Sequence, residues 1–67
     1  REVREMKEIL EKVKKISDTY FSVEERTVFA YRLSGYSYQE IAKILKMSPK
    51  NVDNIMLLIR KKIRLYL

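Results

Sequence analysis

The sequence predicts an all-α fold, a small helical domain of about four helices, and three observations support this prediction. Serine residues suited to start a helix occur at Ser22, Ser37 and Ser48, and the first two are followed three residues later by glutamate. Such a Ser-x-x-Glu pattern is a capping box, in which both side chains satisfy free backbone N–H groups at a helix start. Apolar residues recur at spacings of three or four. No β-hairpin signal, repeat or low-complexity tract interrupts them.

Residues 2–19 are predicted to form an amphipathic helix, because apolar residues recur at helical spacing with Glu and Lys between them. We expect this apolar stripe to be buried locally. Residues 1–21 are therefore interpreted as a linker or packing helix, and residues 22–67 as the main domain. The stripe consists of Val3, Met6, Ile9, Leu10, Val13 and Ile16.

Three further helices are predicted in residues 22–67. The first begins at Ser22-x-x-Glu25 and ends at Gly35, the only glycine, because a left-handed residue after a helix is usually glycine. The second begins at Ser37 and has about two turns, since Ser48-Pro49 signals a new helix start. The last runs from Pro49 toward Tyr66. Its apolar face consists of Val52, Ile55, Met56, Ile59 and Ile63.

The composition argues against catalytic and metal chemistry. The 67 residues include no cysteine and no histidine, so imidazole bases, imidazole ligands and thiolate zinc sites are absent. We expect no enzyme activity, no cofactor and no metal. No apolar run approaches the roughly 18–20 residues of a membrane span, and we expect no membrane partner. No signal peptide is visible. Because the chain starts at Arg1, we expect it to be a fragment of a longer protein.

Basic charge is concentrated at the C-terminal end. The chain carries a net charge of +6, and the last twenty residues account for most of it, with five basic side chains and one acidic one. This asymmetry points to a polyanionic partner that is bound by the last helix.

The two helices joined by Lys46-Met47-Ser48 have the pattern of a helix-turn-helix. The helices of this motif cross at a steep angle, so a small residue, here Ala42, is needed where they come closest. Lys46 stands where the turn usually has glycine, and we expect a strained backbone or a different turn there. The predicted apolar core of the motif consists of Ile41, Ala42, Leu45, Met47, Val52 and Ile55.

The last helix is predicted to read DNA. With Val52 buried, a rotation of 100° per residue places Lys50, Asp53 and Asn54 on the outer half of the helix. Asparagine pairs with adenine, lysine with guanine or a phosphate, and aspartate with the cytosine amino group. The candidates for base reading are Lys50, Asn51, Asp53, Asn54 and Leu57. The candidates for phosphate contact are Arg26, Tyr38, Gln39, Ser48, Arg60 and Lys61. The basic block of residues 60–64 either approaches the DNA backbone or complements the helix dipole.

The stretch from Ser22 to Leu67 resembles region 4 of bacterial RNA polymerase sigma factors of the sigma-70 type. The Lys50-x-Val52-Asp53-Asn54 run is most similar to the sigma-H branch. The other matching features are Glu25-Arg26-x-Val28-Phe29, Gly35-Tyr36-Ser37-Tyr38-Gln39-Glu40-Ile41-Ala42 and Arg60-Lys61-Lys62-Ile63.

This resemblance implies a winged-helix-like or sigma region 4 DNA-binding domain in the bacterial cytoplasm, associated with the nucleoid through polymerase. Its partners would be double-stranded promoter DNA, read at the −35 element, the β-flap of the RNA polymerase core, and in some settings an anti-sigma factor. An apolar groove of the earlier helices would bind the flap. Phe21, Val28, Phe29 and Leu33 are expected in that groove or in the core.

Other interpretations remain open at this point. The output domain of a LuxR-type regulator shares the helix-turn-helix and often dimerises, whereas an isolated region 4 is expected to be monomeric, so the hydrodynamic mass separates the two. A helical protein-interaction module without DNA contact is the alternative from another class. A membrane-surface helix in residues 52–67 is disfavoured, because its basic residues gather at one end.

Overall fold

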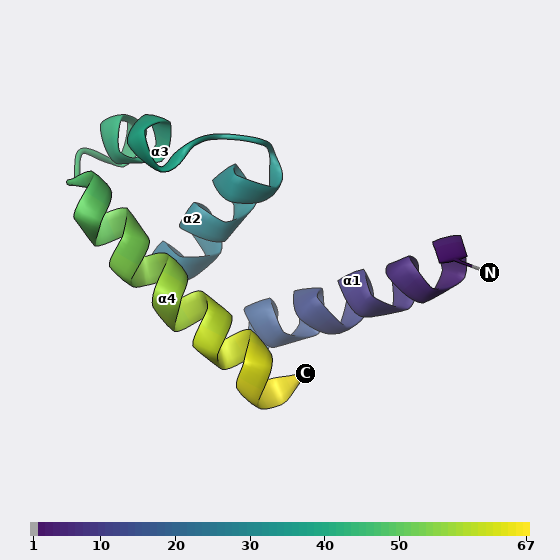
Figure 1. Ribbon diagram of the computed structural model, residues 1–67. Coiled ribbons are helices and arrows are strands. Elements are labelled where there is room, and N and C mark those ends of the chain that lie inside the picture. Colours follow the sequence, from purple (N-terminus) through teal and green to yellow (C-terminus); the bar gives the residue numbers. More distant parts are fainter. Residues whose placement is uncertain (1) are drawn as a thin grey trace.

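The computed structural model describes residues 2–67, with side chains described from residue 5 onward. Four helices follow one another: α1 (Glu2–Tyr20), α2 (Val23–Leu33), α3 (Tyr38–Leu45) and α4 (Pro49–Tyr66). Figure 1 shows α2, α3 and the first half of α4 grouped together, while α1 extends away from them. The predicted all-α class with a helix-turn-helix is confirmed. No strand, and hence no wing, occurs within the described residues.

The serine residues start the helices as predicted. Ser22 Oγ accepts the N–H of Glu25 at 3.1 Å, and the Glu25 carboxylate accepts the N–H of Ser22 at 2.7 Å. Ser37 and Glu40 form the same reciprocal pair, and these two capping boxes satisfy N–H groups that the helices leave free. Gly35, with φ +94°, follows the end of α2.

The helix α4 is the centre of the fold, since α1, α2 and α3 each pack against it. Val28, Ile41, Val52 and Ile59 are fully buried and come from three different helices. Burying such side chains contributes roughly 1.5–3 kcal/mol each relative to leaving them exposed. The rest of the core consists of Ile16, Phe21, Ala42, Ile55 and Met56.

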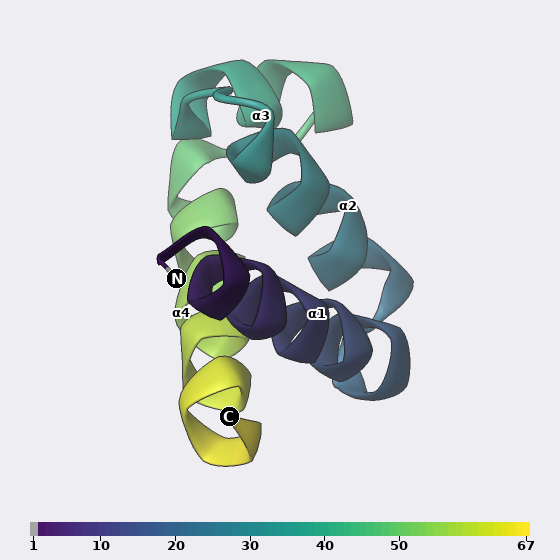
Figure 2. The same cartoon turned by 90° about the vertical axis from the view of Figure 1, so that its right-hand side faces the viewer.

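Only the C-terminal end of α1 packs on the domain. Ile16 is buried, but the exposed fractions of Met6, Ile9 and Leu10 are 63%, 51% and 58%. The expectation that the whole apolar stripe is locally buried is therefore wrong for these three residues; the side chain of Val3 lies outside the described residues. The physical reason is direction: α1 leaves the domain at its C-terminal end and projects away as an arm (Figure 1), so that in Figure 2 it lies in front of the other helices.

Phe21 fixes the connection between α1 and α2. Its ring is buried and packs edge-to-face on Phe29, with ring centroids 5.5 Å apart. Phe21 directly precedes the Ser22 cap, and its ring contacts an aromatic ring further along α2. Such a pair is worth about 0.5–1.5 kcal/mol beyond its buried area.

Candidate nucleic-acid interface

The helix-turn-helix is formed by α3 and α4. Ile41, Ala42, Val52 and Ile55 are buried between them, while Leu45 and Met47 are partly buried at the edge. Ala42 is the small residue at the helix crossing, because a larger side chain there would hold the two helices apart. This core sets the direction in which α4 projects its first turns.

The turn between α3 and α4 uses a left-handed lysine. Lys46 has φ 55° and ψ 49°, and the N–H of Met47 donates to the carbonyl of Ala42 at 2.9 Å. Of the two options that the sequence left open, the structure therefore has the strained backbone. Ser48 then caps α4, since its Oγ accepts the N–H of Asn51 at 3.1 Å. Pro49 follows at the first helical position.

The outer face of α4 carries the predicted base-reading residues. All five side chains are exposed, whereas Val52, Ile55 and Met56 between them are buried. Asn51 is held back toward the turn, because its Nδ2 donates to Sδ of Met47 at 3.5 Å. The exposed face thus presents one cation, one carboxylate, two amides and one leucine. These five residues are Lys50, Asn51, Asp53, Asn54 and Leu57.

A cationic cluster lies where α2, α3 and α4 meet. Nη2 of Arg60 donates to the hydroxyl of Tyr38 at 2.9 Å, which brings two predicted phosphate candidates together. The guanidinium of Arg32 lies 5.1 Å from the centroid of the same ring, a cation–π contact, and donates to the carbonyl of Tyr36 at 2.7 Å. Sequence reasoning missed Arg32, since only the tertiary arrangement brings it beside Tyr38 and Arg60.

The remaining phosphate candidates are exposed but dispersed. Ser48 lies at the start of α4, and Lys61 lies near its end. Gln39 lines a hollow of about 470 Å³ between α3 and the start of α4. Arg26 is elsewhere: together with Phe29 it lines a groove between α1 and α2.

Lys62 departs from the expectation that residues 60–64 act as one basic block. Its Nζ lies 2.6 Å from Oε1 of Glu25, and Glu25 is only 5% exposed. Burial by itself raises the pKa of Glu25, but the bonds from Lys62 and Ser22 outweigh it and leave the pKa below its ordinary value. Lys62 therefore stabilises the fold through this ion pair, because a buried carboxylate needs a partner. Arg60, Lys61 and Arg64 remain exposed.

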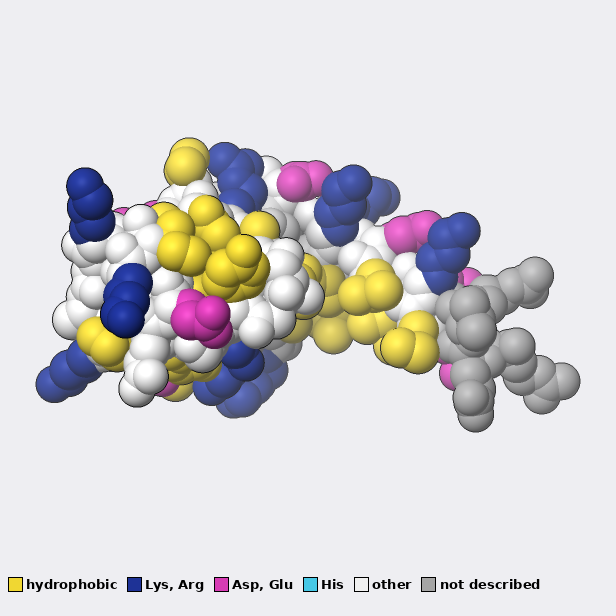
Figure 3. Space-filling model, turned by 90° about the horizontal axis from the view of Figure 1, so that it is seen from above, with side chains coloured by type: hydrophobic (Ala, Val, Ile, Leu, Met, Phe, Trp, Pro, Cys, Tyr) yellow, Lys and Arg dark blue, Asp and Glu magenta, His cyan; other side chains and the backbone are white. Residues whose placement is uncertain are grey.

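The groove between α1 and α2 is apolar, with a volume of about 340 Å³. Leu10 and Val13 form one wall, and Phe29 and Leu33 form the other. Figure 3 shows hydrophobic side chains continuing from the body of the molecule onto the arm. Of the residues expected in a groove or in the core, Phe21 and Val28 are buried in the core, whereas Phe29 and Leu33 line this groove.

Two other features are absent from the described part of the chain. Side chains 5–67 contain no group of three or more acidic residues arranged to hold a metal ion. None of the four helices is both long and apolar enough to cross a membrane.

The packing of α3 against α4 around a short turn defines a helix-turn-helix domain. Residues 22–63 match the family described as Sigma-70, region 4, and since this is more than half of the chain, the chain belongs to that family. The family is a DNA-binding domain of sigma factors, not an enzyme family, and implies contact with promoter DNA and RNA polymerase in transcription. Comparisons with curated proteins and with solved structures found no match.

Proposed function

We propose that this domain recognises the −35 element of a promoter as the region 4 part of a sigma factor bound to RNA polymerase. The observation that carries the proposal is the outer face of α4. Polar, base-reading side chains alternate there with buried residues, so the first turns of α4 are free to enter the major groove. Family membership favours this interpretation over the LuxR-type alternative.

Each of the five predicted base-reading side chains of α4 has a chemical match in the major groove. Asn54 and Asn51 offer an amide donor and acceptor, the combination that pairs with adenine. Lys50 suits guanine or a phosphate, Asp53 suits the cytosine amino group, and Leu57 suits a thymine methyl. Asp53 would be repelled by nearby phosphates unless it accepts a hydrogen bond from a base or a neighbouring lysine. We therefore assign base reading to this face.

Phosphate contacts are proposed for the residues that flank the recognition face. Tyr38 and Arg60 act together with Arg32, because the three groups form one cluster in which both arginines are exposed. Ser48 suits a phosphate oxygen, because its hydroxyl can donate a hydrogen bond and the N-terminal end of α4 favours negative charge. The remaining proposed contacts are Gln39, Lys61 and Arg26, and Arg26 has the least support because it borders the groove.

The groove between α1 and α2 is the proposed contact with the β-flap of the polymerase core. Apolar side chains on both walls suit an amphipathic helix, which buries one face in such a groove. Residues 1–21 would then act as a linker or packing helix that completes the groove, and residues 22–67 as the DNA-binding unit. An anti-sigma factor is proposed as a further protein partner.

Two finer assignments rest on the resemblance. The Lys50-x-Val52-Asp53-Asn54 run supports placement in the sigma-H branch. Bacterial origin and a cytoplasmic, nucleoid-associated location through polymerase follow from the proposed role.

Selection from a pool of promoter sequences tests the proposed function. Full-length protein with core polymerase is expected to enrich one −35-like hexamer, and the Asn54→Ala variant is expected to lose preference at one of its positions. Arg64→Ala, which removes an exposed charge outside the proposed reading face, is the matched control and should enrich the same hexamer. Failure of the wild-type complex to enrich any sequence upstream of the start site would contradict the proposal.

A further inference from the structure

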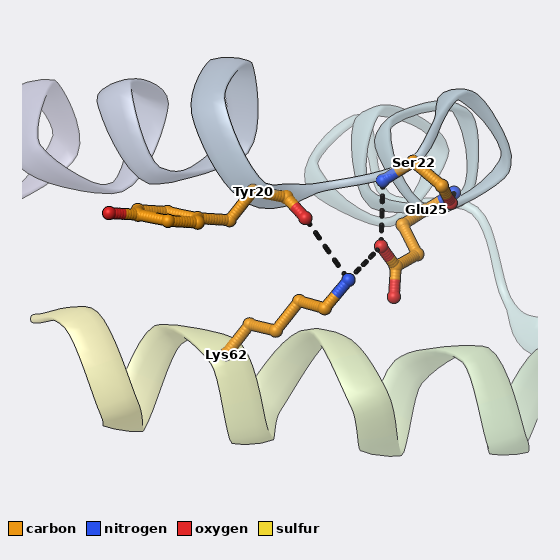
Figure 4. Close-up of polar contacts among 4 residues, drawn as sticks. All are labelled: Tyr20, Ser22, Glu25 and Lys62. Atoms are coloured by element: carbon orange, nitrogen blue, oxygen red, sulfur yellow. Dashed lines mark hydrogen bonds and ion pairs between the residues drawn. The ribbon is translucent and has the colours of Figure 1, made fainter.

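Lys62 of α4 contacts the end of α1 and the start of α2 at the same time (Figure 4). Its Nζ donates to the backbone carbonyl of Tyr20 at 3.1 Å and to Oε1 of Glu25 at 2.6 Å. The same carboxylate oxygen accepts the N–H of Ser22 at 2.7 Å. One ammonium group thus connects three helices at the point where α1 joins α2.

The carbonyl of Tyr20 is a favourable acceptor for this cation. The last carbonyls of a helix lack partners within the helix and carry partial negative charge. The last turn of α1 has no basic residue of its own. Lys62 supplies the missing cation from another helix, 42 residues further along the chain.

An aromatic stack adjoins the polar contacts. The rings of Tyr20 and Tyr66 are parallel, with centroids 3.7 Å apart. Together with the buried side chains of Ile16 and Phe21, this stack confines the attachment of α1 to its last turns and the residue that follows. The helix α1 packs on α4, whereas the groove separates it from α2.

The direction of α1 therefore depends on a small region at one end. A helix rises about 1.5 Å per residue, so Leu10 lies roughly 15 Å along the helix from Tyr20. A small rotation at Tyr20 moves Leu10 and Val13 by a large amount relative to α2. Those two residues form the α1 wall of the groove.

We propose that Lys62 is a positioning residue that holds α1 in a fixed direction and thereby builds the groove between α1 and α2. Although it lies within the basic tail of α4, its role is to place the arm. The consequence for polymerase binding rests on the proposed function, but the placement of α1 does not.

Distance measurements between pairs of spin labels test the placement. The chain has no cysteine, so introduced cysteines are labelled selectively. Lys12→Cys with Lys43→Cys reports the position of α1 relative to α3, and Glu24→Cys with Lys43→Cys reports α2 relative to α3. All three positions are exposed. Each pair is measured in the wild-type, Lys62→Met and Lys61→Met backgrounds.

In the wild type we expect one narrow distance between positions 12 and 43. Lys62→Met should broaden this distribution and leave the distance between positions 24 and 43 unchanged. The matched control Lys61→Met removes the same charge one residue away and should change neither distance. If Lys62→Met fails to fold, the double variant Glu25→Gln/Lys62→Met replaces it, because the neutral amide keeps the Ser22 contact and needs no cation, while the contact of Lys62 with Tyr20 is still removed.

Three results would overturn the inference: a broad wild-type distribution between positions 12 and 43, an unchanged distribution in Lys62→Met or its substitute, or equal broadening in Lys61→Met. Binding to core polymerase adds a separate readout, which should weaken in Lys62→Met. If the wild-type chain itself does not bind the core, the proposed polymerase contact fails, while the distance result still decides the role of Lys62.

Discussion

Replacing Glu25 by glutamine isolates the contribution of the buried ion pair to stability. The chain contains a matched control, because Glu25 and Glu40 occupy the same position in two capping boxes of nearly equal geometry. Only Glu25 has a cationic partner, Lys62. In both variants glutamine keeps the oxygen that accepts the N–H of the N-cap serine. Glu40→Gln therefore measures how much the loss of the carboxylate charge in a capping box changes stability when no lysine is paired with it.

The expected loss in Glu25→Gln follows from the contact and its exposure. A hydrogen bond to a charged group contributes about 1.5–3 kcal/mol. The Lys62 side chain is 34% exposed, and screening by solvent reduces that contribution. We therefore expect the free energy of unfolding of Glu25→Gln to be about 1–2 kcal/mol lower than that of Glu40→Gln. For a domain of this size each kcal/mol lowers Tm by about 4–8 °C.

The pH dependence gives a second signature. The folded-state pKa of Glu25 lies below the value of 4.5 that serves as the unfolded reference. The stability from the charged carboxylate is therefore present above that value and lost as the pH falls through the lowered folded pKa. The free energies of unfolding of wild type and Glu25→Gln, measured with urea, should differ at pH 7, and the difference should shrink as the pH is lowered below 4.5. An equal loss in both glutamine variants at pH 7, or a difference that does not shrink at acidic pH, would refute the role of the ion pair.

Three other substitutions test the turn and the recognition helix. Lys46→Gly should raise the free energy of unfolding by up to about 1 kcal/mol. The left-handed conformation costs a non-glycine residue about 1–2 kcal/mol, but the greater conformational entropy of glycine in the unfolded chain offsets part of this gain. A lower Tm would contradict this prediction. Asn54→Ala should lose about 1–3 kcal/mol of discrimination at one base pair, and equal weakening on all sequences would make Asn54 a phosphate contact. Lys61→Ala should reduce the slope of log K against log salt by about one unit, measured by fluorescence anisotropy, and an unchanged slope would remove Lys61 from the phosphate contacts.

Local signals account for how well the helices were predicted. Each capping box joins residues three apart, so the sequence alone specifies where α2 and α3 begin. Gly35 likewise marks the end of α2. The buried face of α4 also follows from helical spacing, and its four most buried residues are among the five that were predicted. Exposure of the base-reading candidates follows from the same periodicity.

Contacts between helices could not be predicted in this way. The cluster of Arg32, Tyr38 and Arg60 joins three helices and has no sequence spacing of its own. The apolar stripe of α1 has the spacing of a buried face, yet Met6, Ile9 and Leu10 are exposed because the arm leaves the domain. Periodicity shows which side of a helix is apolar, but it does not show whether another helix lies beside it.

The sequence by itself determined the four helices, the helix-turn-helix and the concentration of basic charge on α4, because these depend on neighbours within a few residues. Only the tertiary structure decided that Lys62, one of those basic residues, turns inward to a glutamate 37 residues away. The physical reason is that the crossing of α2 with α4 encloses the Glu25 carboxylate, and a charge removed from water requires a partner of opposite sign.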